Sequence, residues 1–223
     1  LSKFLSVVNR DRTIDIWGRD RADRFPELQG LLRLCGRSGF KKIRLWTTGL
    51  GLNSEEKLDR LRSLGVTALE LPIYGSTAPT HDSVTGRAGA YRGLNKVLER
   101  LARRADFEVS AHCVALNSNV RELPELCGLV RSYSRDWKLA FWHYYPDYRS
   151  AVERNKYLGS LPSYDDVFSA FAQQRADGKA DFVLFPECFV ARLRRVFTGA
   201  RFFVQVPRAR LLVCRDGLFY FQL

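Results

Sequence analysis

The chain contains no methionine and no apolar run of the roughly 18 residues that a transmembrane helix needs. Its N-terminal stretch, LSKFLSVVNRDR, becomes charged too soon to be a secretory signal peptide. These absences predict a soluble cytoplasmic protein without a membrane partner.

The absence of methionine includes position 1, and Leu1 lies within an amphipathic pattern that no cap or turn precedes. Two interpretations of this start stay open. Either the chain is a fragment of a longer protein, or the initiator methionine has been removed from a protein that is poor in methionine.

Cysteines are few, and none has the spacing of a metal site. No C-x-x-C or C-x-x-x-C occurs, which excludes a zinc knuckle and a self-contained iron–sulfur loop. We therefore expect no metal ligands in this chain. In a cytoplasmic protein each cysteine is expected to be a small buried hydrophobic residue. The five cysteines are Cys35, Cys113, Cys127, Cys188 and Cys214.

Acidic residues are outnumbered, with 24 Asp and Glu against 36 Lys and Arg and a net charge of +12. Such a balance permits attraction to nucleic acid or to an anionic substrate. The basic residues are scattered along expected helices, as in LERLARR and ARLRR, and nothing resembles an RNA-recognition motif. We expect a solvated basic surface and rank a nucleic-acid partner last.

Short β-forming segments alternate with amphipathic helical patterns. The expected strands are 13–18, 41–49, 68–75, 107–116 and 138–145, and the expected helices are 26–39, 53–65, 90–104, 120–134 and 163–178. This alternation predicts parallel strands joined by right-handed crossovers. The strand spacing of roughly 30 residues is typical of a βα barrel. No Gly-rich phosphate turn follows the first strand, which disfavours a Rossmann domain.

The pattern changes near residue 180. The segments after it are short and rich in β-forming residues, and CRDGLF has the residues of a hairpin turn. We therefore expect two parts, a barrel domain over 1–180 and a small β-rich C-terminal extension over 181–223.

A long polar loop without a helix is expected between the strand 68–75 and the helix that starts near Tyr91. In parallel α/β sheets, ligands bind at the carboxyl ends of the strands, where this loop begins. Ser76 and Thr77 there could donate hydrogen bonds to a polar ligand. Ordinary turn chemistry is the alternative reading of the same residues.

The ordered motifs over 14–146 resemble the radical S-adenosylmethionine (radical SAM) enzymes. IDIWGRD, FPEL and KKIRLWTTG are similar to the family's Gly-Arg-Glu-Pro strand end, its Pro-Asp-Leu helix start and its Thr-Asn-Gly strand end. YGSTAPTHDSVTGRAGAY resembles the family's Gly-Ser-Thr turn, His-Asp pair and Gly-x-Phe or Gly-x-Tyr helix start. VALNSNVRELPEL resembles the exit of its fifth strand.

The resemblance implies an α/β fold, a partial (β/α)6 TIM-like barrel whose first unit is missing here. It also implies S-adenosylmethionine and a [4Fe–4S] cluster as cofactors, and an electron donor as partner. In the family, reductive cleavage gives a 5′-deoxyadenosyl radical that abstracts hydrogen from a substrate. The substrate of this chain, a small molecule or a peptide, is unknown.

The chain departs from the family because it lacks the Cys-x-x-x-Cys-x-x-Cys loop that holds the cluster. Two interpretations stay open. The chain is an enzyme fragment whose cluster loop lies upstream of Leu1, or it is a degenerate, non-catalytic barrel that serves as a binding or partner subunit.

By the same resemblance, several residues are candidates for cofactor binding. Gly18, Arg19 and Asp20 match the motif that meets the methionine amino group, with an ion pair in the loop as the alternative for Asp20. Thr48 stands where the family has Asn and could make one hydrogen bond. Glu70 could face the cofactor if it points into the barrel.

Four further features complete the prediction. Asn117 is a candidate partner of the ribose or carboxylate, with an Asx-turn or a helix cap as the alternative. His81 and Asp82 are expected to order their loop. The aromatic cluster 141–148 could stack on adenine or a substrate ring, and Cys188 could ligate an auxiliary cluster in a longer protein.

Overall fold

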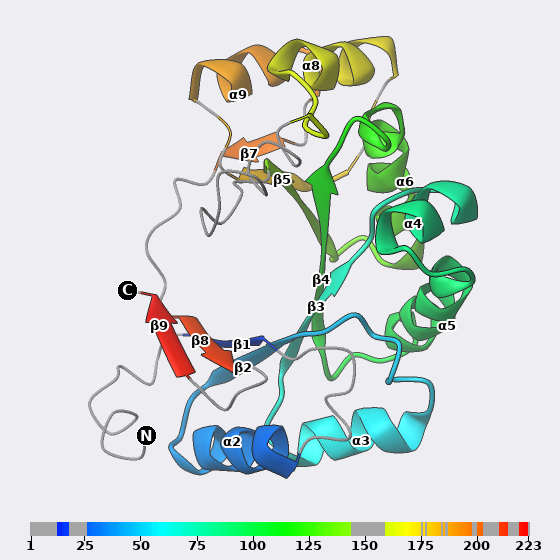
Figure 1. Ribbon diagram of the computed structural model, residues 1–223. Helices are drawn as coiled ribbons and strands as arrows, with labels where there is room; N and C mark the ends of the chain where they lie inside the picture. The colour runs from blue at the N-terminus through cyan, green and yellow to red at the C-terminus, as the bar shows by residue number, and fades with distance from the viewer. Residues whose placement is uncertain are drawn as a thin grey trace. The chain divides into compact units, whose positions relative to one another are not determined.

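Helices and strands alternate along the computed structural model (Figure 1), which describes residues 13–17, 26–143, 159–174, 176, 178–183, 185, 187–197, 200–202, 210–213 and 219–222. The strands are β1 Thr13–Trp17, β2 Lys42–Trp46, β3 Ala68–Pro72, β4 Glu108–Ala115, β5 Lys138–His143, β6 Ala180–Val183, β7 Ala200–Phe202, β8 Arg210–Val213 and β9 Phe219–Gln222. The helices are α2 Pro26–Arg37, α3 Glu55–Ser63, α4 Ala78–Thr85, α5 Ala90–Ala102, η1 Val120–Glu122, α6 Leu123–Tyr133, α8 Tyr164–Gln173 and α9 Glu187–Leu193.

The strands are hydrogen-bonded in the order β7-β6-β5-β4-β3-β2-β1-β8-β9. The strands from β1 to β6 are parallel and neighbour each other in chain order, whereas β8 pairs parallel with β1 and antiparallel with β9. The α/β class and the parallel arrangement are thus confirmed. The strand order is consistent with a partial βα barrel.

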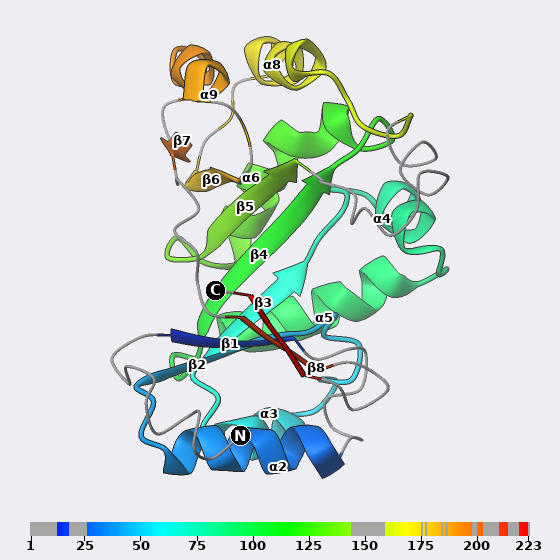
Figure 2. The ribbon, with the colours of Figure 1, turned by 60° about the vertical axis from the view of Figure 1, so that its left-hand side comes forward.

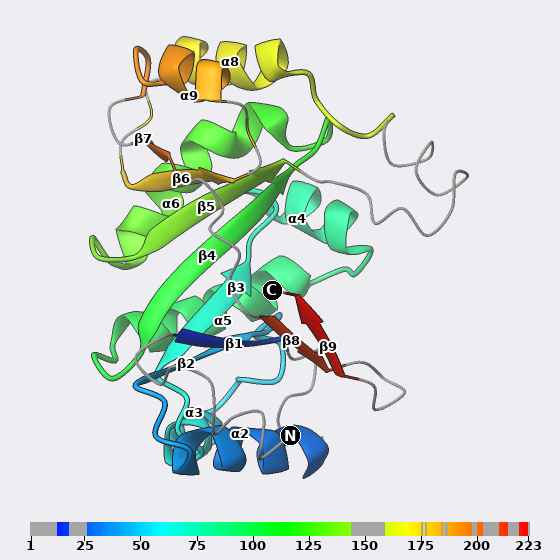
Figure 3. The same cartoon turned by 90° about the vertical axis from the view of Figure 1, so that its left-hand side faces the viewer.

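The described residues fall into two compact units. Unit 1 comprises those within Leu1–Leu71, Arg92–Ser110 and Pro207–Leu223, and unit 2 comprises those within Pro72–Tyr91 and Ala111–Val206. In unit 1, α2 and α3 lie side by side next to β1 and β2, and the β8–β9 pair continues from β1 (Figure 3). In unit 2, α6, α8 and α9 follow one another beside β5, β6 and β7 (Figure 2).

Strand alternation divides the side chains of unit 1 between two faces of the sheet. One face carries buried aliphatic residues that pack with the apolar stripes of the helices. These residues are Ile14, Ile16, Ile43, Leu45 and Leu69 on the strands, Leu28, Leu31, Leu32 and Cys35 on α2, Leu58 and Leu61 on α3, and Leu94, Val97, Leu98 and Leu101 on α5. The residues between them on the strands must therefore point to the opposite face, which is polar and aromatic.

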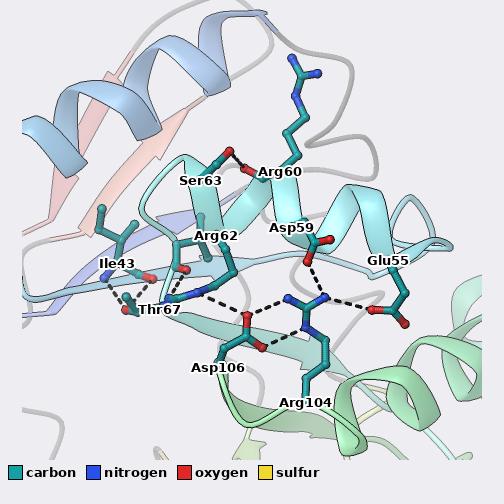
Figure 4. Close-up of polar contacts among 10 residues, drawn as sticks. Ile43, Glu55, Asp59, Arg60, Arg62, Ser63, Thr67, Arg104 and Asp106 are labelled. Atoms are coloured by element: carbon teal, nitrogen blue, oxygen red, sulfur yellow. Dashed lines mark hydrogen bonds and ion pairs between the residues drawn. The ribbon is translucent and has the colours of Figure 1, made fainter.

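An ionic cluster around Arg104 joins α3 to the turn between α5 and β4 (Figure 4). The Arg104 guanidinium donates to Asp59 at 2.7 Å, to Glu55 at 2.9 Å and to Asp106 at 2.7 Å. It also lies 5.4 Å from the centre of the Phe107 ring. The hydrogen bond to Asp106 is the main reason why the pKa of Arg104 is raised. Arg104 therefore stabilises the fold through these bonds, and its guanidinium is not available to bind a nucleic acid.

Two expectations about secondary structure are wrong. The loop after β3 contains α4, with Pro79 in its first turn, where proline is tolerated, and Gly86 as a left-handed C-cap at φ 66°. The segment 187–193, which its composition assigns to a β-rich region, is the helix α9. Both helices are short, and α4 buries only His81, so α4 shows no strong apolar period. The division at residue 180 stays a prediction.

No helix among the described residues combines the length and the apolar character that crossing a membrane requires.

Candidate functional site

The polar face of unit 1, defined by Asp15, Trp17, Arg44, Trp46 and Glu70, is the first part of the candidate site. The parallel register aligns Asp15 with Arg44, and it aligns Trp17 with Trp46 and Trp46 with Glu70. Register partners in a parallel sheet project from the same face, so the five side chains form one continuous surface.

Asp15 is the centre of this face and is only 2% exposed. Its carboxylate accepts hydrogen bonds from the Trp46 Nε1 at 3.1 Å and from the Arg44 guanidinium at 3.4 Å. The Trp17 and Trp46 rings stack with centroids 4.6 Å apart and an interplanar angle of 11°. The Nε of Arg44 is buried and has no hydrogen-bond partner in the described part of the chain. A buried charge and planar rings thus lie together in unit 1.

Thr48 and Glu70 come from neighbouring strands of unit 1, as a shared site requires. The backbone N–H of Thr47 donates to the carbonyl of Glu70 at 3.1 Å, which places Thr48 beside the carboxyl end of β3. Glu70 is 4% exposed. The Thr48 hydroxyl is buried and has no partner among the described residues. Buried polar groups normally have a partner, so this hydroxyl is a candidate ligand contact.

In unit 2, the loop that follows β3 closes on a carboxylate from η1. Glu122 accepts from the backbone N–H groups of Ser76 at 2.7 Å and Thr77 at 3.2 Å. It also accepts from the hydroxyls of Ser76 at 2.9 Å, Thr77 at 3.2 Å and Thr80. We call Glu122 with Ser76, Thr77 and Thr80 the Glu122 clamp. The groups of Ser76 and Thr77 that the sequence assigns to a ligand therefore bind the protein's own carboxylate.

Two opposing effects set the pKa of Glu122. Burial raises it, while the hydrogen bonds from Thr80, Ser76 and Thr77 lower it, and the net pKa lies below the usual range. Hydrogen bonds to the ionised form favour that form. The clamp is thus a carboxylate held in its charged state.

His81 and Asp82 order the loop, as the sequence predicts. The His81 Nδ1 accepts from the backbone N–H of Tyr74 at 3.1 Å, and burial lowers the pKa of His81, which favours the neutral ring. Asp82 accepts from the N–H groups of Gly89 at 2.6 Å and Tyr91 at 2.8 Å. The bond from Tyr91 is the main reason why the pKa of Asp82 is lowered. The two residues therefore fix both ends of α4.

Asn117 and the nearby Asn119 differ in exposure and in their hydrogen-bond partners. Asn117 is exposed, donates from its Nδ2 to the Gly159 carbonyl at 3.0 Å and from its backbone N–H to the Ser160 carbonyl at 2.8 Å. Asn119 is 1% exposed, and its Nδ2 donates to the carbonyls of Tyr74 and Val114 at 2.9 Å each. Asn119, which the sequence did not single out, is the amide that ties the ends of β3 and β4 together.

Aromatic side chains gather at the carboxyl ends of β5 and β6 in unit 2. His143 lies 5.1 Å from Tyr164 and 5.3 Å from Phe185, and Phe189 lies 5.2 Å from Phe185, all between ring centres. Burial lowers the pKa of His143. Of the expected cluster 141–148, positions 144–148 lie outside the described residues.

The remaining predicted site residues are less informative. Gly18, Arg19 and Asp20 lie outside the described residues. Cys35, Cys113 and Cys127 are buried, as expected of structural cysteines, but Cys188 is exposed. Among the described residues no three His, Cys, Asp or Glu side chains are grouped as a metal site would need.

Comparison with known proteins gives one weak similarity. No protein-family model matches the chain. Over 106 residues the chain is 29% identical to a protein of Methanosarcina barkeri (strain Fusaro / DSM 804) described as AdoMet-dependent heme synthase. The match covers 48% of this chain and 30% of that protein. This similarity gives weak support for the radical SAM superfamily.

Proposed function

We propose that the chain is the S-adenosylmethionine-binding part of a radical SAM enzyme. The observation that carries the proposal is the buried hydroxyl of Thr48, which has no hydrogen-bond partner in the described ranges and lies one strand away from the buried carboxylate of Glu70. Thr48 follows the carboxyl end of β2, and Glu70 lies in β3 beside that end, near the edge of the sheet where α/β proteins bind ligands. The similarity to an AdoMet-dependent heme synthase points to the same cofactor.

The residues of this chain suit one of the two implied cofactors, S-adenosylmethionine, but not the other, the [4Fe–4S] cluster. Thr48 and Glu70 offer one hydroxyl and one carboxylate that could receive the polar groups of S-adenosylmethionine. The printed sequence has no cysteine triplet, and the described residues hold no metal-ligating group of three. The chain's own residues therefore do not fit a [4Fe–4S] cluster, whose ligands we propose to lie upstream of Leu1.

When both groups are bound, the family's chemistry is the reductive cleavage of S-adenosylmethionine to a radical. The contribution of this chain would be to bind and orient the cofactor and to exclude water from it. Thr48 would hydrogen-bond a polar group of the cofactor, and the carboxylate of Glu70 would attract a cationic one. Gly18, Arg19 and Asp20 are proposed as further contacts, whereas Asn117, which belongs to unit 2, is a candidate from the family resemblance alone.

Replacing Thr48 with valine is expected to weaken binding of S-adenosylmethionine about 3- to 10-fold, the effect of losing one neutral hydrogen bond. Valine keeps the shape and removes a buried hydroxyl that has no partner in the part of the chain that the structure describes. The variant should therefore unfold at an equal or higher urea concentration than the parent. Isothermal titration with S-adenosylmethionine and urea unfolding measure the two effects.

Thr85→Val is the matched control, because the Thr85 hydroxyl is exposed and bonds the Asp82 carbonyl in unit 2. Its affinity should equal that of the parent. Equal affinities of Thr48→Val and the parent would contradict the assignment of Thr48. If the folded parent bound no S-adenosylmethionine at millimolar concentration, the proposed function itself would be wrong.

Iron binding distinguishes the radical SAM enzyme from the alternative, a non-catalytic barrel. A longer chain that includes upstream sequence should bind iron and turn brown on anaerobic reconstitution if the enzyme reading is right. A natural start codon directly before Leu1, together with S-adenosylmethionine binding, would favour the binding subunit instead.

A further inference from the structure

A cavity of about 310 Å³ lies in unit 2, away from the carboxyl ends of β5 and β6 at which the aromatic side chains gather. Its walls come from the end of α6, from the turn before β5 and from the residues before β6. Because β5 and β6 are parallel, these are the amino ends of both strands. The lining residues are Cys127, Val130, Arg131, Arg135, Asp136, Trp137, Gly178 and Lys179.

Backbone contacts fix the shape of this cavity. Gly178 has a φ of 139°, and a Cβ there would lie 3.4 Å from the carbonyl oxygen of Cys127. Glycine thus lets the chain pass close to α6 in a conformation that other residues avoid. On the other side, the N–H of Trp137 donates to the Ser134 carbonyl at 3.3 Å. The Trp137 ring stacks on Tyr133 with centroids 5.7 Å apart. The cavity is a preformed feature of the fold.

The charge of the cavity is strongly positive. Among the described lining residues, the bases Arg131, Arg135 and Lys179 accompany one acid, Asp136, which gives these four residues a net charge of +2. Arg135 and Lys179 are exposed, and neither makes an ion pair within the described part of the chain. Like charges around a concave surface with apolar walls concentrate the positive potential and attract anions.

We propose that this cavity binds a small organic phosphate. The net charge of +2 matches a phosphate monoester, which carries a charge of about −1.5 to −2 at neutral pH. Guanidinium groups bind phosphate oxygens in a bidentate way, and a lysine adds a point charge. Val130 and the 8% exposed Trp137 offer an apolar wall to the organic part. The volume is at the lower end of the range for ligand pockets, which favours a small molecule.

The test compares adenosine 5′-monophosphate, inorganic phosphate and adenosine as probes on the whole chain, by titration calorimetry. The two phosphates should bind, and adenosine should bind at least about 10-fold more weakly than its monophosphate. Arg135→Gln and Lys179→Gln should each weaken phosphate binding about 3- to 10-fold, less than the full effect of one charged hydrogen bond because water screens these exposed side chains. The double variant should lose more affinity than either single variant.

Arg103→Gln and Lys96→Gln are the matched controls, since both residues are exposed, basic and in unit 1. They should leave the affinity unchanged. Affinities that fall equally in the control and cavity variants would show only a general charge effect and overturn the proposal. So would equal binding of adenosine and its monophosphate, or no binding of either phosphate at about 10 mM. S-adenosylmethionine binding reports on the separate site in unit 1 and should not change in the cavity variants.

Discussion

Replacing Asp15 with alanine is expected to destabilise the protein by about 3 kcal/mol, as does the loss of one partner from a buried ion pair. The Asp15 and Arg44 side chains are only 3% and 13% exposed. Without the carboxylate, the Arg44 charge and the Trp46 Nε1 lose their acceptor in a site that excludes most water. Urea unfolding of the parent and the variant measures the difference in the free energy of unfolding.

We expect Asp15→Ala to lose stability because it leaves the buried Arg44 charge without a partner, rather than because the Asp15–Arg44 ion pair itself stabilises the fold. A second variant distinguishes these two causes. Asp15→Leu combined with Arg44→Met removes both charges and keeps the volume, so it should recover most of the lost stability. Arg44→Met alone should cost less than Asp15→Ala if the carboxylate keeps its bond from Trp46. A double variant as unstable as Asp15→Ala would show that the pair itself stabilises the sheet.

The same variants bear on function. A buried pair that can be replaced by apolar residues at little cost in stability has no need to be there for folding. If the double variant folds but loses ligand affinity, the polar face of unit 1 is retained for binding. Unchanged binding by the double variant would assign the pair to structure alone.

The polar face shows what the sequence could and could not predict. The alternation in TIDIW and KIRLW, which places Asp15 and Arg44 between buried aliphatic residues, can be read in the chain. The register that aligns Asp15 with Arg44 cannot, because one residue of slip would move the whole set to the other face. Strand positions were therefore predictable, whereas the pairing of Trp17 with Trp46 required the structure.

The loop after β3 shows a second limit. Its hydroxyl groups were correctly placed at a strand end, but their partner, Glu122, lies 46 residues after Ser76. Sequence reasoning identifies donors and cannot tell a ligand from a distant side chain of the same protein. The bonds that Asp82 accepts from Gly89 and Tyr91 span at most nine residues, and the sequence predicts that Asp82 orders this loop without identifying these donors.

Replacing Glu122 with alanine is expected to destabilise the protein by about 2 kcal/mol. Five donors of Ser76, Thr77 and Thr80 point at this carboxylate. A hydrogen bond to a charged group contributes about 1.5–3 kcal/mol, but the total stays near the lower value because water reaches this half-buried site. Hydrogen exchange should rise first at the N–H groups of Ser76 and Thr77, and urea unfolding gives the free energy.

The pH dependence of this variant distinguishes the clamp from simple packing. The pKa of Glu122 is lowered in the folded protein, so the clamp contributes its full stability above the unfolded pKa of about 4.3. That contribution is lost as the pH falls through the folded pKa. The difference between the parent and Glu122→Ala should therefore be largest at neutral pH and shrink below about pH 4.3. A difference that stays constant to pH 3 would mean that Glu122 acts through its apolar contacts, and would contradict the stabilising role of the Glu122 clamp.

Glu125→Ala is the matched control. Among the described contacts Glu125 accepts only from the Ser76 hydroxyl, so this substitution should lower the free energy of unfolding by less than half as much as Glu122→Ala.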